Sequence, residues 1–95
     1  MVASSPPTIR LREGPVHVTG EDRPLVERLR EPLHEALADR SRFYSIRVHG
    51  VGRRGEVLIG ITGSAGHVPL LFGKEELGPA HVFQVVRETV TRLGI

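Results

Sequence analysis

The chain contains no cysteine among its 95 residues. This absence excludes disulfide bonds, thiolate zinc sites and thiol nucleophiles. Long apolar runs are also missing, since the stretch from Val68 to Phe72 falls far short of the roughly 20 residues that span a bilayer. The first residues, MVASSPPT, lack the basic start and apolar stretch of a secretory signal. We therefore expect a cytoplasmic protein without a membrane partner, with a disordered lead-in at 1–7 and one domain at 8–95.

Recognisable catalytic and metal-binding patterns are absent as well. Serine, aspartate and histidine occur without the spacing of a known nucleophile elbow or triad. Both aspartates, Asp22 and Asp39, fall at expected helix ends, where capping explains them. No two of the histidines share the helical spacing of a metal site: His17, His34, His49, His67 and His81. We expect no enzymatic activity, no metal and no cofactor.

Apolar residues that alternate with polar ones predict strands with one buried face. Alternation around Glu13-Gly14-Pro15 predicts an N-terminal hairpin, with arms near Ile9 and Val16. Three further alternating runs, within 43–50, 55–62 and 68–72, are joined by turns too short for crossovers. They predict a three-stranded antiparallel meander. Whether the N-terminal hairpin joins this sheet is left open by the sequence.

Two segments have the three- and four-residue apolar spacing of amphipathic helices. The first, 22–39, begins within a capping sequence, Thr19 to Pro24, and we expect Pro32 to kink or divide it. The second, 80–93, opens after Gly78-Pro79 and ends at Gly94. The order ββαβββα predicts a two-layer α+β fold with both helices on one face of the sheet. Its expected core is Leu25, Leu29, Leu33, Ile46, Val48, Val57, Ile59, Ile61, Val82, Val86 and Leu93.

The stretch HGVGRRGEV, residues 49–57, fits the glycine pattern that covers nucleotide phosphates in protein kinases. Two observations favour a hairpin turn instead. Gly55 leads into a strand rather than a helix, and that strand carries no lysine for phosphate. Tight antiparallel turns also need residues that tolerate positive φ. A second run, Gly60 to Gly66, lacks the Gly-Lys-Ser/Thr ending of a Walker loop and is interpreted as another turn.

Positive charge is concentrated in one window. Residues 40–55 include five arginines and no acid, whereas basic and acidic residues mix in the rest of the chain. Arginine's planar fork suits phosphate, and an exposed aromatic ring can stack on a base. Two alternative explanations need no ligand. Arginines at the end of a helix can offset its dipole, and arginines at a turn can keep the protein soluble. The window predicts a DNA- or RNA-binding surface: Arg40, Arg42, Phe43, Arg47, His49, Arg53 and Arg54.

The run VHGVGRRGEVLIGITGSAGHVPLLFGKEEL, within residues 48–93, resembles the glycine-rich strands of the YbaB/EbfC nucleoid-associated proteins. Those proteins have a helix, three meandering strands and a C-terminal helix. The resemblance implies a homodimer that binds DNA without strong sequence preference. The chain departs from that family in its N-terminal hairpin and in the first helix, which Pro32 interrupts.

Two functions from different classes remain open. The first is nucleic-acid binding through the 40–55 window. The second is a protein-interaction or regulatory module that pairs through its sheet or a helix face. Apolar residues on both faces of a strand favour a homodimer, because a small two-layer core cannot cover them all. The expected dimer contact consists of Leu71, Phe72 and Phe83, or includes the final helix.

Overall fold

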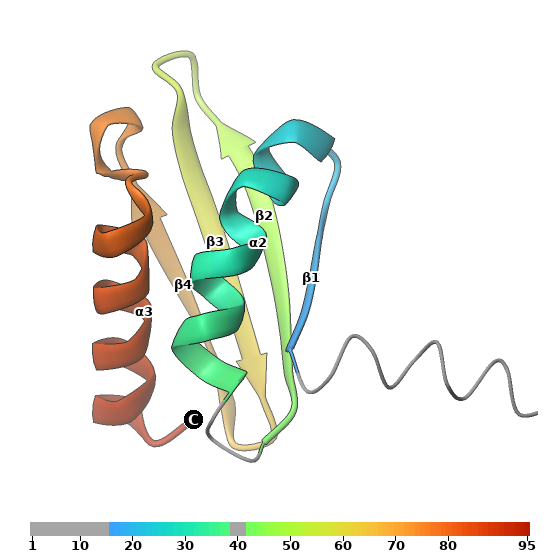
Figure 1. Cartoon of the computed structure of the whole chain (residues 1–95), viewed down its shortest axis with the longest axis vertical. Helices are drawn as coiled ribbons and strands as arrows, with labels where there is room; N and C mark the ends of the chain where they lie inside the picture. The colour runs from blue at the N-terminus through green and yellow to red at the C-terminus, as the bar shows by residue number, and fades with distance from the viewer. Residues whose placement is uncertain (1–15, 39–41) are drawn as a thin grey trace, which may run out of the picture.

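The structure is a computed structural model, and it describes residues 16–38 and 42–95. Two helices cover one face of a four-stranded sheet, which confirms the α+β class (Figure 1). No helix within the described ranges is long and apolar enough to cross a membrane. In chain order the elements are β1 (Val16–Gly20), α2 (Arg23–Leu37), β2 (Tyr44–Val51), β3 (Glu56–Gly63), β4 (Gly66–Phe72), the 3-10 helix η2 (Lys74–Glu76) and α3 (Pro79–Leu93).

The sheet has the order β1-β2-β3-β4. Strands β2, β3 and β4 form the predicted antiparallel meander, in which Ile59 pairs with Val48 on one side and Leu70 on the other. Strand β1 joins the sheet at its edge and runs parallel to β2, so the sheet is mixed. Parallel neighbours require a crossover, and α2 supplies it. The first arm of the predicted N-terminal hairpin lies outside the described residues.

Helix α2 begins where the capping sequence predicts. The Asp22 side chain accepts a hydrogen bond from the backbone N–H of Leu25 at 3.2 Å, and Pro24 occupies the first turn. Of the two outcomes predicted for Pro32, a kink or a division of the helix, the division is wrong, because Arg23–Leu37 is one helix of 15 residues. Pro32 lacks the N–H that would bond to the carbonyl of Arg28. Its ring is buried in the helix layer, so packing offsets the missing hydrogen bond.

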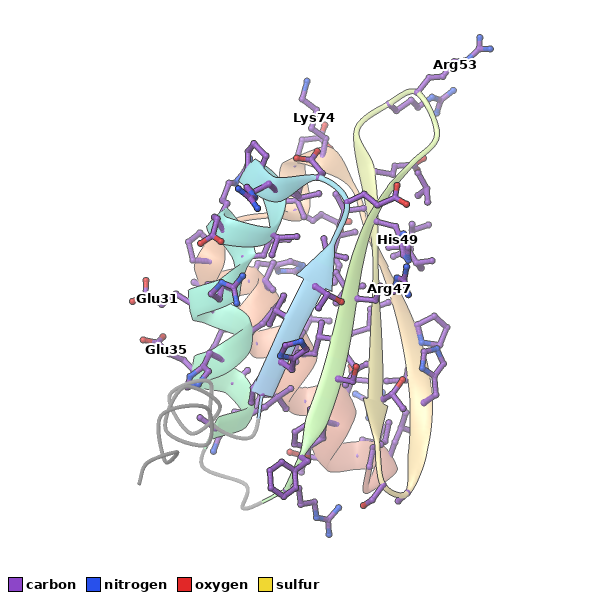
Figure 2. The ribbon with its side chains drawn as sticks, turned by 90° about the vertical axis from the view of Figure 1, so that its right-hand side faces the viewer. Glu31, Glu35, Arg47, His49, Arg53 and Lys74 are labelled. Atoms are coloured by element: carbon purple, nitrogen blue, oxygen red, sulfur yellow. The ribbon has the colours of Figure 1, made fainter. Side chains whose placement is uncertain are left out.

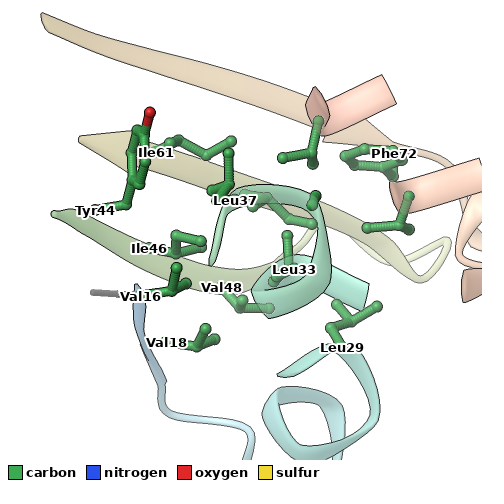
Figure 3. Close-up of a cluster of buried hydrophobic side chains, with 14 of the residues drawn as sticks. Val16, Val18, Leu29, Leu33, Leu37, Tyr44, Ile46, Val48, Ile61 and Phe72 are labelled. Carbon is green, nitrogen blue, oxygen red and sulfur yellow. The ribbon is translucent and has the colours of Figure 1, made fainter. Parts of the chain in front are cut away.

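The core lies between the sheet and the two helices (Figure 3). Nine of the eleven predicted core residues are buried there, including Ile59, which is fully inaccessible. Leu25 is the first exception, because it packs half-buried at the start of α2 while the next residue, Val26, takes the buried position. Strand β1 adds Val16 and Val18 to the core, which explains why it docks on β2.

The second exception is Leu93, which is 56% exposed although it continues the apolar spacing of α3. The cause is the helix end. Gly94 adopts a left-handed conformation with φ 68°, and the backbone N–H groups of Gly94 and Ile95 both donate to the carbonyl of Val90. This turn directs Ile95 inward, where it is buried at the end of the core in place of Leu93.

Candidate nucleic-acid interface

Within residues 16–38 and 42–95, the helices leave one face of the sheet uncovered, which we call the open face (Figure 2). Side chains alternate along a strand, so each residue next to a buried one points to this side. Strand pairing places these residues in rows. The first row is His17, Ser45, Thr62 and His67; the second is Thr19, Arg47, Gly60 and Pro69; the third is His49, Leu58 and Leu71; the fourth is Val51 and Glu56.

Arg47 lies near the middle of the open face, where Figure 2 shows it projecting away from the helices together with His49. It is exposed, as the alternation of β2 predicted, whereas His49 is half-buried. Its neighbours across the strands are Thr19 on β1 and Gly60 on β3. Arg47 makes no hydrogen bond or ion pair with another described residue, so its guanidinium donors are available to a ligand.

The imidazole of His67 leans over Gly60. A Cβ atom placed on Gly60 would lie 3.2 Å from Cε1 of His67, so the ring occupies the space that a side chain at position 60 would need. The Thr62 hydroxyl lies 2.7 Å from Nδ1 of His67 and holds the ring in this orientation. Because Gly60 pairs with Arg47, the ring and the arginine occupy neighbouring positions of the open face.

The stretch HGVGRRGEV forms the β2–β3 hairpin, which confirms the turn interpretation. Gly52 and Gly55 flank its tip with φ 72° and 82°, a left-handed region that side chains disfavour. Arg53 and Arg54 between them, called the tip arginines below, are both exposed. Figure 2 shows Arg53 projecting into solvent. Neither makes an ion pair with another described residue.

Lys74 also belongs to this end of the molecule, although sequence reasoning missed it. Its aliphatic stem packs against Gly55, 3.2 Å from the position of a Cβ there. The residue follows β4 and begins η2, far from the arginine window in the chain. Only the return of β4 to the hairpin end brings this residue beside Gly55, so no local signal could have indicated it.

Carboxylates avoid most of the open face. The first and second rows, which contain His67 and Arg47, have none among their described residues. Glu56 is the one carboxylate that a described strand contributes, at the hairpin end, and Glu21 follows β1 at the same end. All other described carboxylates lie on α2 or its cap, η2 and α3: Asp22, Glu27, Glu31, Glu35, Glu75, Glu76 and Glu88.

The remaining predicted contact residues are not brought together with Arg47. Arg40 lies outside the described residues. Arg42 donates from Nη1 to the carbonyl of Gly94 at 3.2 Å, so it caps the C-terminal end of α3, where a cation also offsets the helix dipole. Phe43 is 80% exposed just before β2, at the end of that strand opposite the tip arginines.

The predicted dimer patch is divided among three environments. Leu71 is 61% exposed on the open face, whereas Phe72 is 2% exposed and belongs to the core. Phe83 packs half-buried against the core from α3, in the helix layer. Alternation along β4 explains why Leu71 and Phe72 separate, since neighbouring residues of a strand point to opposite faces. Phe72 is therefore buried within the fold, and Leu71 and Phe83 lie on opposite sides of the sheet, so the three do not form one surface patch.

No group of three or more histidine, aspartate or glutamate side chains within the described ranges is arranged to hold a metal ion. Comparisons of the chain with models of protein families, with curated proteins and with solved structures find no match. The resemblance to the YbaB/EbfC proteins therefore stays a prediction.

Proposed function

We propose that this protein is a non-enzymatic nucleic-acid-binding protein that contacts the phosphate backbone through Arg47 and the tip arginines. The observation that carries the proposal is the separation of charge between the two sides of the molecule. Among the described residues, Arg47 has no partner and its row has no carboxylate. On α2, by contrast, arginines and glutamates mix, and Arg30 pairs with Glu27 at 3.3 Å.

Phosphate recognition fits the chemistry of these cations. A guanidinium offers several donors in a plane and binds phosphate oxygens in pairs. Ion pairs within the protein would compete for those donors, and none is present at Arg47 or the tip arginines within the described residues. The hairpin end is less favourable for binding phosphate, because the carboxylates of Glu56 and Glu21 lie near it. The positive charge of Lys74 offsets only part of their negative charge. We therefore assign Arg47 the central contact and the tip arginines a supporting one.

The test is fluorescence anisotropy with labelled DNA at several salt concentrations. Binding of the parent protein should weaken steeply as salt rises, because counterions are released from the phosphates. Arg47→Ala and the double variant Arg53→Ala, Arg54→Ala should each bind more weakly, by similar factors for different sequences. The slope of log K against log salt should become shallower by roughly 0.9 for each duplex phosphate that the variant no longer contacts.

A double variant on α2, Arg23→Ala with Arg30→Ala, is the matched control. It removes the same charge as the tip double variant but from the opposite side of the sheet, so it should retain nearly the parent affinity and slope. Two results would overturn the proposal. One is the absence of salt-dependent binding by the parent. The other is an equally large decrease of affinity in the α2 control, which would indicate an effect of net charge alone.

A further inference from the structure

The open face offers flat groups as well as charge. The ring of His67 is held by Thr62 at 2.7 Å and lies over Gly60, while Arg47 projects from β2 at the residue that pairs with this glycine. Imidazole rings and guanidinium planes are both surfaces on which nucleic-acid bases stack. Because position 60 is a glycine, the His67 ring fills the space above it, and a planar ligand meets the ring there rather than the sheet.

The width of the open face favours a single strand over a duplex as the ligand. Four strands about 4.8 Å apart give a face about 14 Å across. The major groove of B-DNA is about 12 Å wide and admits a helix or a two-stranded ribbon. The open face is therefore too broad to enter a groove and read base edges. The bases of a single strand are not held in a duplex and can lie on a broad sheet.

We propose that the ligand is a single-stranded nucleic acid whose bases stack on His67 and Arg47. This inference rests on the proposed function. The backbone of the nucleic acid then runs along β2 towards the tip arginines. The distance from Arg47 to the end of β2 at Val51 is about 13 Å, at roughly 3.3 Å per residue. The first and second rows receive the bases, because they combine the flat groups with an absence of carboxylates among their described residues.

The experiment compares three probes of equal length, about 15 nucleotides, which is the upper end of the site size of small single-strand-binding domains. They are a single-stranded oligonucleotide, its duplex, and an abasic strand that keeps the phosphates and lacks the bases. Stacking is worth about 1–3 kcal/mol for each base, or roughly 5- to 150-fold in affinity. The single strand should therefore bind the parent protein at least about 5-fold more tightly than the abasic strand.

Variants at His67 connect that difference to the site. His67→Ala should remove most of the preference for the strand with bases, whereas His67→Phe keeps a flat ring and should retain it. Thr62→Val removes the hydroxyl that holds the ring and should give an intermediate preference. His81→Ala, at an exposed histidine on α3, is the control and should bind like the parent. Circular dichroism confirms that each variant is folded.

The outcomes separate this inference from the proposed function. Equal affinity for the single strand and the abasic strand, or tighter binding of the duplex, overturns the single-strand inference and leaves phosphate binding in place. A preference for bases that survives in His67→Ala also overturns it, because the stacking platform would then lie elsewhere. Failure of all three probes to bind at low salt overturns both proposals.

Discussion

Tyr44 is the only tyrosine of the chain, and it joins the first strand of the meander to the end of the last helix. Its hydroxyl donates to the main-chain oxygen of Ile95 at 2.9 Å in a buried environment. The ring also lies 3.3 Å from the position of a Cβ on Gly63, so β3 approaches it closely. This residue therefore connects sheet and helix layer where the chain turns inward after Gly94.

We predict that Tyr44→Phe destabilises the protein by about 1–2 kcal/mol. The change keeps the ring and its packing, but it leaves the buried oxygen of Ile95 without this donor. The measurement is the free energy of unfolding from urea denaturation monitored by circular dichroism. Phe43→Leu at the neighbouring, 80% exposed position is the control and should change that energy by no more than about 0.5 kcal/mol. Equal effects would show that the hydrogen bond does not stabilise this corner.

At the scale of elements, strands and turns were the most predictable features. Alternation along β2 and β3 indicates which residues face the core, because the side-chain period of a strand is two. The glycines of HGVGRRGEV likewise indicate a turn, since Gly52 and Gly55 have positive φ. The direction of β1 was not predictable, because a local pattern contains no information about the neighbour with which a strand pairs. The same limit applies to His67, which strand register places beside Arg47, and to Lys74, which lies beside Gly55 only because β4 returns to the hairpin end.

Helix α3 shows where periodicity fails. Its apolar spacing includes Leu93, but a left-handed Gly94 replaces that residue with Ile95 in the core. Glycine at a helix end is a recognisable signal, yet the sequence does not say which flanking residue the turn directs inward. Pro32 illustrates a related limit, because tertiary packing holds α2 together through a residue that disfavours helices.

The same substitution at two leucines tests this description of the helices. Leu33→Ala removes a fully buried side chain of α2 and should destabilise the protein by about 2–5 kcal/mol. Leu93→Ala removes one that is 56% exposed, so we expect a decrease of about 0.5 kcal/mol. Both values come from urea denaturation under the same conditions. Similar decreases at the two positions would mean that Leu93 is buried, either in the core, as the apolar spacing predicted, or in a contact between copies.

At the scale of the whole molecule, the described residues leave a sheet with one open face and with no strand paired to the outer edge of β4. Pro69 lies within that edge strand and pairs with Gly60. Proline has no N–H and is tolerated in a sheet where its nitrogen faces away from the partner strand. The outer edge of β4 therefore lacks a donor at this position, and this disfavours addition of a strand from a second copy.

The homodimer expected from the sequence stays a prediction. Because the β4 edge disfavours the addition of a strand, we expect the two copies to meet at α3. Leu71 belongs to the open face that we assign to nucleic acid, whereas Leu93 lies on the last turn of α3 in the other layer. We predict a homodimer at tens of micromolar, the usual order of magnitude for weak specific association. Leu93→Glu should convert it to a monomer, because the new carboxylate would be buried in the contact.

Light scattering measures the mass of the parent, of Leu93→Glu and of a second variant. Leu71→Glu is this matched control and should leave the dimer intact, since it adds the same charge to the open face. A monomeric parent protein at tens of micromolar would contradict the prediction of a homodimer. If Leu71→Glu dissociates the dimer and Leu93→Glu does not, the open face is the contact between copies. Nucleic acid would then compete with self-association, and its affinity would fall as the protein concentration rises.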